Sequence, residues 1–136
     1  MVYNAFEKGE QEMSQKLNIL VVDDQKVIGD LFEFTLGYSG HAITVVDNAA
    51  NAIDRLKDQS FDIAFLDIVM PQVDGVETFK RIKEVNPNLP IVMMSGYSVE
   101  ERRTLAKDLG AIACLKKPFE MDDVKKIIQV ALGKEI

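Results

Sequence analysis

The chain has 136 residues, of which 47 % are apolar and 28 % charged, and its net charge at neutral pH is −6. This length suits one domain with a proper hydrophobic core. The acidic balance argues against sequence-independent binding of nucleic acid, whose phosphates attract basic surfaces. No apolar run approaches the roughly 20 residues that a membrane-spanning helix needs. We therefore expect neither a nucleic-acid partner nor a membrane partner for this domain.

The start of the chain and its cysteine content favour the cytoplasm. Residues 1–16 are polar and show no sustained period, and we interpret them as a flexible leader or expression remnant. They lack the basic start and apolar centre of a secretory signal. The single cysteine, Cys114, excludes an internal disulfide and a thiol cluster for zinc. We expect one domain over 17–133 and a short tail over 134–136.

Short apolar runs alternate with stretches of helical spacing along this domain. The runs are rich in β-branched residues, which is typical of buried strands in a parallel sheet. The intervening stretches repeat apolar residues every three or four positions and end near glycine or proline, which predicts amphipathic helices. We expect strands at 17–22, 41–46, 61–67, 89–94 and 111–115, and helices at 25–38, 48–58, 75–85, 99–109 and 121–132.

This alternation predicts an α/β domain. Five strands separated by helices indicate a doubly wound parallel sheet in the order 2-1-3-4-5, flanked by five helices. The apolar spacing sets the expected inward faces: Val27, Ile28, Leu31 and Phe34 on the first helix, and Ala131 among others on the last.

Three residues or pairs outside the apolar pattern have structural interpretations. Asp47 precedes the second helix and suits its N-cap. Asp74-Gly75 fits the chemistry of a turn, with no catalytic role. His41 begins a strand at the end of the sheet opposite to the strand ends considered next, and it receives no functional weight.

Polar side chains follow four of the five predicted strands. Asp23 and Asp24 follow the first strand, Asp67 the third, Ser95 the fourth and Lys117 the fifth. Ligands of an open α/β sheet bind at the carboxyl ends of its strands, at the point where the strand order reverses. In the expected order the first and third strands are neighbours, so the three aspartates should meet there.

A cluster of three carboxylates needs a compensating charge, because like charges raise one another's pKa. With only oxygen donors available, the ion should be hard, Mg²⁺ or Mn²⁺. Asp67 is then placed to attack phosphorus, Lys117 to pair with a phosphoryl oxygen and Ser95 to donate to another. Asp23-Asp24 alone would suit a helix N-cap equally well. The combination with Asp67 and Lys117 favours the metal interpretation.

Four motifs in this order resemble the response-regulator receiver domain of two-component signalling, the CheY-like fold. The resemblance covers about residues 17–133 and is specific because four separate motifs agree. The motifs are Asp23-Asp24, the stretch Leu66-Asp67-Ile68-Val69-Met70-Pro71, Met94-Ser95-Gly96 and Lys116-Lys117-Pro118-Phe119.

The resemblance implies that Asp67 accepts a phosphoryl group from the phosphohistidine of a histidine kinase or histidine phosphotransferase. It implies that Asp24 and Asp67 ligate Mg²⁺ directly, together with the carbonyl of Val69, and that Asp23 acts mostly through water. The domain would phosphorylate and dephosphorylate only itself, so it would be a signalling switch in the cytoplasm rather than an enzyme acting on other substrates.

The switch implied by the resemblance is incomplete here. Ser95 occupies the family's serine or threonine switch position, and Lys117 its lysine position, preceding a proline bond that is often cis. Three residues before the lysine the family usually has tyrosine or phenylalanine, but this chain has Cys114, which we expect to be a small buried hydrophobe. Tyr97 is a candidate for a substitute ring.

The partners follow from the same resemblance. The kinase or phosphotransferase would dock on the first helix, at Val27, Ile28 and Leu31, and on the loop after Lys117. Core packing is the alternative for the three apolar residues, and Leu31 in particular is assigned to the core. An effector domain or protein, or a second copy in a phosphorylation-dependent dimer, would read the face built from the fourth helix, fifth strand and fifth helix.

Two other functions remain as alternatives. A haloacid-dehalogenase-type phosphatase also uses an aspartate nucleophile with Mg²⁺, but it wants a second acid two residues on, where this chain has Val69, and a cap domain for which there is no room. A pseudo-receiver would bind partners without phosphorylation. The intact Asp67, acid pair and Lys117 argue against it.

Overall fold

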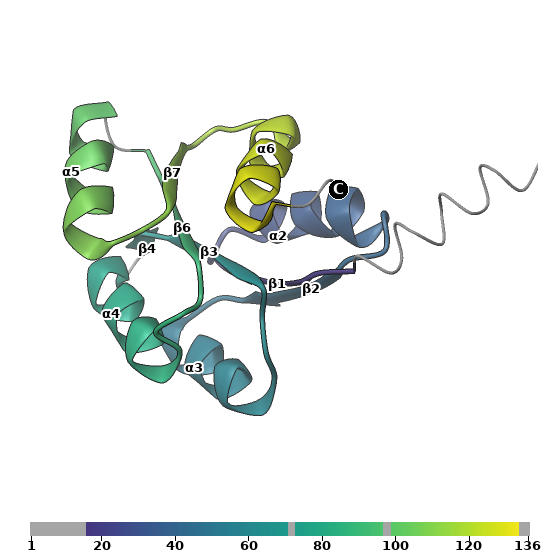
Figure 1. Ribbon diagram of the computed structural model, residues 1–136, viewed down its shortest axis with the longest axis horizontal. Coiled ribbons are helices and arrows are strands. Elements are labelled where there is room, and N and C mark those ends of the chain that lie inside the picture. Colours follow the sequence, from purple (N-terminus) through teal and green to yellow (C-terminus); the bar gives the residue numbers. More distant parts are fainter. Residues whose placement is uncertain (1–15, 71–72, 97–98, 134–136) are drawn as a thin grey trace, which may run out of the picture.

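The computed structural model describes residues 16–70, 73–96 and 99–133. The expected leader, apart from Lys16, the expected tail and the candidate Tyr97 lie outside the described residues. The described residues form a five-stranded sheet in the order β2-β1-β3-β6-β7, with every neighbouring pair parallel (Figure 1). This confirms the expected order 2-1-3-4-5. The strands are β1 (Asn18–Val22), β2 (Ala42–Val46), β3 (Ile63–Asp67), β6 (Ile91–Ser95) and β7 (Ala113–Lys116).

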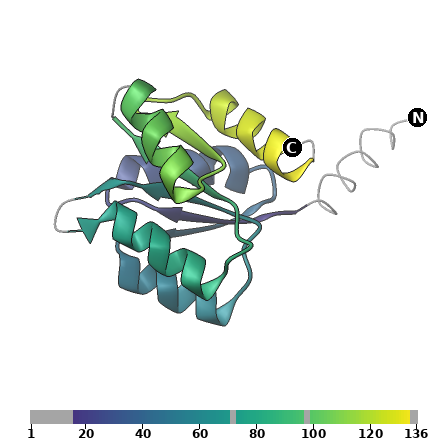
Figure 2. The same cartoon turned by 60° about the vertical axis from the view of Figure 1, so that its left-hand side comes forward.

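Helices cover both faces of the sheet (Figure 2). Helices α2 and α6 pack on one face, while α3, α4 and α5 pack on the other. Among the helices of the described ranges, none is both long and apolar enough to cross a bilayer. The helices are α2 (Lys26–Phe32), α3 (Ala49–Asp58), α4 (Gly75–Val85), α5 (Val99–Leu109) and α6 (Met121–Leu132).

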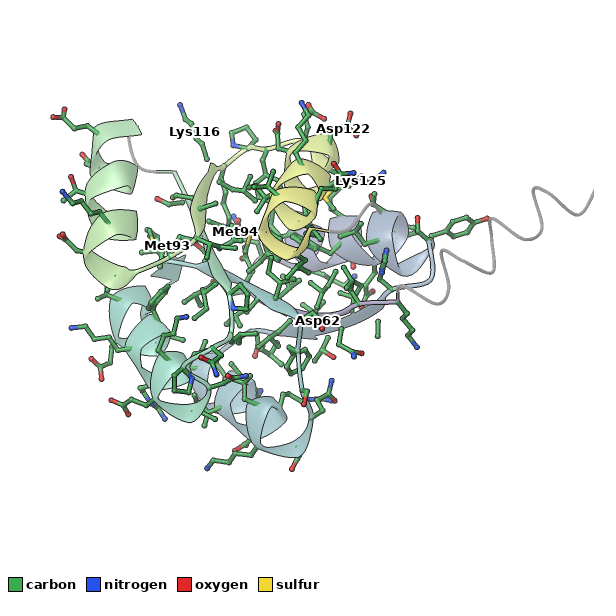
Figure 3. All side chains as sticks on the ribbon, viewed as in Figure 1. Asp62, Met93, Met94, Lys116, Asp122 and Lys125 are labelled. Atoms are coloured by element: carbon green, nitrogen blue, oxygen red, sulfur yellow. The ribbon has the colours of Figure 1, made fainter. Side chains whose placement is uncertain are left out.

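The central strands are buried on both faces, as expected for a parallel sheet between two helix layers. All five residues of β3 and of β6 are buried. Met93 and Met94 follow each other on β6 and pack into opposite cores, Met93 with α3 and α4 and Met94 with α2 and α6 (Figure 3). The fully apolar interior of β3 holds Asp67 in place at the strand's carboxyl end.

The expected inward face of the first helix is wrong for three of its four residues, and Ile28 alone is buried as expected. Val27 and Phe34 are 60 % and 80 % exposed, and Leu31 is also exposed. Phe32 and Leu36 pack into the core beside Ile28. Gly29 explains this phase: a Cβ on it would lie 2.7 Å from Val45, so this side of α2 presses against the sheet. The helix then continues as a π-helix, η1 (Glu33–Gly37), rather than as α-helix to residue 38.

Two smaller expectations also fail. Asn48, not Asp47, caps α3, because its side-chain oxygen accepts the N–H of Asn51 at 2.8 Å. The Asp47 carboxylate instead accepts from the Asn48 amide at 2.9 Å. Ala131 is exposed on α6, since Val124 and Ile128 carry that helix's buried face.

His41 has a structural role at the amino end of the sheet. Its ring is buried, and Nδ1 accepts the backbone N–H of Leu17 at 3.1 Å, just before β1. Burial lowers the pKa of the imidazole. A neutral ring is also required by the hydrogen bond, because a protonated Nδ1 has no lone pair to accept with. This arrangement ties the start of β1 to the residue that precedes β2.

We expect the imidazole of His41, the only histidine in the sequence, to titrate below its ordinary pKa of about 6.5. The folded state then binds this proton less readily than the unfolded chain does, so the fold should lose stability as the pH falls below about 6.5. The histidine Cε1 proton resonance of the untagged protein measures the midpoint. In His41→Asn, whose side-chain oxygen can still accept from Leu17, this part of the pH dependence should vanish. A midpoint above 6.5 would contradict the assignment.

Candidate functional site

Asp67 is a buried acid at the carboxyl end of β3. Its side chain is 4 % exposed, and both carboxylate oxygens are engaged. One oxygen accepts the backbone N–H of Val69 at 3.0 Å, and the other accepts from the Lys117 ammonium at 3.0 Å. A carboxylate held from both sides on a rigid strand end has little freedom to turn, which suits a group that must attack along one direction.

The acid pair after β1 reaches the same place. One carboxylate oxygen from each of Asp23, Asp24 and Asp67 lies within 4.8 Å of the others. The parallel register explains this meeting, since Val22 pairs with Leu66 and the next residue on each strand is an aspartate. The expected convergence of the three acids is therefore confirmed.

The two members of the acid pair differ in their surroundings. Asp23 is buried: one carboxylate oxygen accepts the backbone N–H of Gln25 at 2.9 Å, and the other lies 2.7 Å from the Lys117 ammonium. Asp24 is exposed at the mouth of the cluster. Asp23 makes a turn-type hydrogen bond to Gln25, which is itself the N-cap residue of α2, so the interpretation of the acid pair as a helix N-cap is wrong.

Lys117 supplies the positive charge at the centre of the cluster. It follows β7, and its backbone N–H donates to the carbonyl of Ser95 at 2.8 Å, which fixes the segment that carries it. The Lys117-Pro118 peptide is cis, as the family resemblance suggested. Lys116, by contrast, points into solvent (Figure 3). Of the two adjacent lysines, Lys117 alone joins the carboxylates.

The electrostatics of the cluster are unbalanced. Burial raises the pKa of the Asp67 carboxyl, and the charge of Asp23 raises it further, while the hydrogen bonds from Lys117 and Val69 act in the opposite direction. Among the described residues, one ammonium faces three carboxylates, and the buried oxygen of Asp23 beside it has no partner in hydrogen-bond geometry. This all-oxygen, electron-rich donor set fits a hard divalent cation such as Mg²⁺.

The remaining candidate residues that the structure describes are Ser95, Val69 and Cys114, and they differ in burial and in their place on the sheet. Ser95 is fully buried at the end of β6, on the strand next to Asp67. Val69 is 53 % exposed and contacts Asp67 through its backbone. Cys114 pairs with Met93 across the sheet, and its side chain is only partly buried, against the core under α3 and α4. It lies on β7 where the family usually has an aromatic ring.

Two features of the site were missed from the sequence. Gln25 accepts a hydrogen bond from the Lys117 ammonium at 2.8 Å, although 92 positions separate them in the chain. Directly after Asp67, β4 (Val69–Met70) and β5 (Val73–Asp74) pair antiparallel and return the chain to α4. Neither residue type nor spacing distinguishes Gln25 from any other polar residue before a helix.

Gly75 does more than the expected turn. It is the first residue of α4 and is buried, and a Cβ on it would lie 2.2 Å from the carbonyl oxygen of Ile68. Ile68 stands between Asp67 and Val69, so the backbone that holds the acid packs directly on this glycine. The absence of a side chain at Gly75 therefore lets α4 approach the strand end that carries Asp67.

Comparisons with known proteins agree with this geometry. A model of the response regulator receiver domain family matches residues 19–129. The chain is similar to the transcriptional regulatory protein FixJ of Bradyrhizobium diazoefficiens, with 35 % identity over 120 residues that cover 88 % of this chain and 58 % of FixJ. The chain spans less than two thirds of the length of the curated relatives it matches.

Solved structures give the same result. The chain is similar to NtrX from Brucella abortus, with 34 % identity and a TM-score of 0.74 over 87 % of this chain and 27 % of that one. It is also similar to a CheY-like response regulator receiver domain protein from Methanospirillum hungatei, with 25 % identity and a TM-score of 0.78 over 87 % of this chain and 94 % of that one.

We expect Asp67→Asn to raise the midpoint of thermal unfolding by a few degrees at pH 7 in buffer with a chelator. Because burial raises the pKa of Asp67, its ionisation costs stability as the pH rises from its unfolded value of about 3.9 through the folded value. The neutral amide avoids this cost. The gap should close as the pH falls toward 4. A variant less stable than the wild type at pH 7 would contradict this account of the electrostatics.

We expect Gly75→Ala to destabilise the fold by roughly 1–3 kcal/mol, the usual cost of overpacking, because the new methyl group meets the backbone of Ile68. Urea unfolding measures the change. Gly96→Ala is the matched control, since a Cβ there meets nothing within 4 Å. Equal stability of the two variants would show that α4 does not press on the strand end.

Proposed function

Because the chain belongs to the response regulator receiver domain family, we propose that Asp67 accepts a phosphoryl group in a Mg²⁺-dependent reaction and that this modification switches a partner-binding surface. One observation carries the proposal: the Lys117 ammonium lies 3.0 Å from a buried carboxylate at the end of the central strand β3. A fixed acid with a fixed cation beside it is what a phosphoryl acceptor requires.

The carboxylate of Asp67 is the nucleophile. One of its oxygens attacks phosphorus, the new P–O bond forms while the bond from phosphorus to the donor's imidazole nitrogen breaks, and the electron pair of that bond stays on the nitrogen. The carboxylate has no proton to lose, so no general base is needed. Lys117, next to the attacked position, offsets the negative charge of the transferred group.

Asp24, Asp67 and the carbonyl of Val69 are the groups that would hold Mg²⁺, with Asp23 contributing mostly through water. When bound, the ion supplies positive charge to the phosphoryl oxygens. The exposed position of Asp24 and the buried position of Asp23 support this division. Ser95, at the end of the adjacent strand, is the proposed donor to a phosphoryl oxygen in the switched state.

The phosphoryl donor is a phosphohistidine of a kinase or phosphotransferase. The surface proposed for it begins beside the acid cluster, on α2, where the apolar side chains of Val27 and Leu31 are exposed rather than packed in the core. Farther along the chain, Phe34 on η1 and Tyr38 just after η1 are 80 % and 90 % exposed. Exposed apolar side chains along one helix are typical of a protein-docking surface.

The proposed output surface is the face formed by α5, β7 and α6. A groove of about 380 Å³ lies between the start of β7 and α6, and it is lined mainly by apolar side chains that include Ile112, Ile127 and Val130. An effector domain or protein, or a second copy of the chain, would bind there. Cys114 leaves β7 without the usual aromatic ring, so the link from Asp67 to this face would run through Ser95 and the segment after β6.

We expect incubation with acetyl phosphate and Mg²⁺ to add the mass of one phosphoryl group, because the small donor needs no docking surface. Intact-mass spectrometry measures the gain. Asp67→Ala should abolish it, whereas Asp58→Ala, at an exposed position in α3, should not.

A wild-type protein that gains no mass would support a pseudo-receiver instead. A mass gain that persists in Asp67→Ala would place the acceptor elsewhere. Rapid release of phosphate from unrelated phosphoesters, with turnover, would indicate a phosphatase.

A further inference from the structure

The Lys117 ammonium has a partner that the proposed reaction does not use. Among the described residues it contacts three side chains: Asp23 at 2.7 Å, Asp67 at 3.0 Å and Gln25 at 2.8 Å. The two aspartates belong to the acid cluster. The carbonyl oxygen of the Gln25 amide is the third partner, and it comes from the residue just before α2.

Gln25 is held by its backbone. Its N–H donates to Asp23 at 2.9 Å, and its carbonyl accepts the N–H of Ile28 at 3.0 Å in the first turn of α2. Its side chain makes no capping hydrogen bond to that helix. The backbone of Gln25 is therefore fixed, and its side-chain amide lies against the Lys117 ammonium. One residue touches two members of the site, Asp23 through its backbone and Lys117 through its side chain.

The three contacts of the Lys117 ammonium differ in function: those with Asp23 and Gln25 position it, and the one with Asp67 faces the acceptor. A lysine side chain is flexible, and its ammonium has three N–H donors. The ammonium donates hydrogen bonds to Gln25 and Asp67, whereas Asp23 lies beside it as an ion-pair partner outside hydrogen-bond geometry. Gln25 and Asp23 together hold the ammonium where one of its donors meets the carboxylate oxygen of Asp67. A phosphoryl group attached to Asp67 would meet that donor, while the contacts with Gln25 and Asp23 stay in place.

We propose that Gln25 is a positioning residue for Lys117, which it holds in the orientation that receives the phosphoryl group. The inference rests on the proposed function. The amide oxygen adds an acceptor for the ammonium beside the carboxylates of Asp23 and Asp67. An isosteric apolar side chain would fill the same space and leave the lysine with the carboxylates alone.

The test compares two substitutions of nearly equal length. Gln25→Met removes the acceptor, and Gln25→Glu keeps one. Gln59→Met, at an exposed position after α3, is the control for the same chemical change. Two quantities are measured in each variant: the rate of phosphorylation by acetyl phosphate with Mg²⁺, and the affinity for beryllofluoride with Mg²⁺, which probes the lysine without bond breaking. Calorimetry suits the second measurement, because the chain contains no tryptophan.

In Gln25→Met we expect both the rate and the beryllofluoride affinity to fall about three- to tenfold, the effect of losing one hydrogen bond to a charged group at a partly exposed site. Gln25→Glu should retain most of both, and Gln59→Met all of both. The affinity for Mg²⁺ alone should be unchanged in Gln25→Met, because Gln25 reaches the lysine and not the exposed carboxylate of Asp24. A merely structural role of Gln25 would not lower the rate and the beryllofluoride affinity while leaving the Mg²⁺ affinity unchanged.

Wild-type rate and affinity in Gln25→Met would overturn the inference. Equal losses in Gln25→Met and Gln25→Glu would also overturn it, because the acceptor would then not be the cause. If the wild type itself gains no phosphoryl group, the proposed function fails and this inference fails with it. That outcome is recognised in the wild type alone, before any variant is compared.

Discussion

The interaction on which the site depends is the contact of one ammonium with two buried carboxylates. Lys117 lies within 3.0 Å of both Asp23 and Asp67, which are almost fully removed from water. Two buried carboxylates this close together need a compensating positive charge, and Lys117 supplies it. The lysine is in turn held by the chain, through its backbone bond to Ser95. The cluster therefore carries more negative than positive charge. Its geometry is fixed by the backbone that holds the lysine.

The fold brings Asp23, Asp67 and Lys117 together and restricts their movement. Three strands of a parallel sheet deliver the two acids and the lysine to one edge, and each strand is anchored by apolar packing on both faces. The close approach of Gly75 to Ile68 presses α4 against the backbone beside Asp67. A phosphoryl acceptor needs little more from the protein than positioning and charge, because the chemistry itself is a direct displacement.

The sequence predicts the parts of this arrangement that depend on pattern. Buried strands are marked by apolar runs, and the acids and lysine follow those runs directly, so the strand order and the meeting of Asp23, Asp24 and Asp67 could be predicted. The phase of α2 could not, because it depends on how closely Gly29 packs against Val45, a contact between distant segments.

The role of Gln25 escaped prediction for a similar reason. Its partner Lys117 lies 92 positions away, and a glutamine before a helix is ordinary in composition. The π-helix η1 and the choice of Asn48 over Asp47 as the cap of α3 likewise depend on local backbone geometry that residue type does not fix. The sequence predicts features that depend on apolar periodicity and on the residues at strand ends. It does not predict features that depend on contacts between distant segments or on local backbone geometry.

The most direct test of the central claim is a crystal structure of the protein with Mg²⁺ and beryllofluoride. We predict beryllium bound to a carboxylate oxygen of Asp67, a fluorine atom within hydrogen-bond distance of the Lys117 ammonium, and the metal ion on Asp24 and Asp67. A structure with beryllofluoride on another residue, or with Lys117 still paired to Asp67 and turned away from the fluorides, would contradict it.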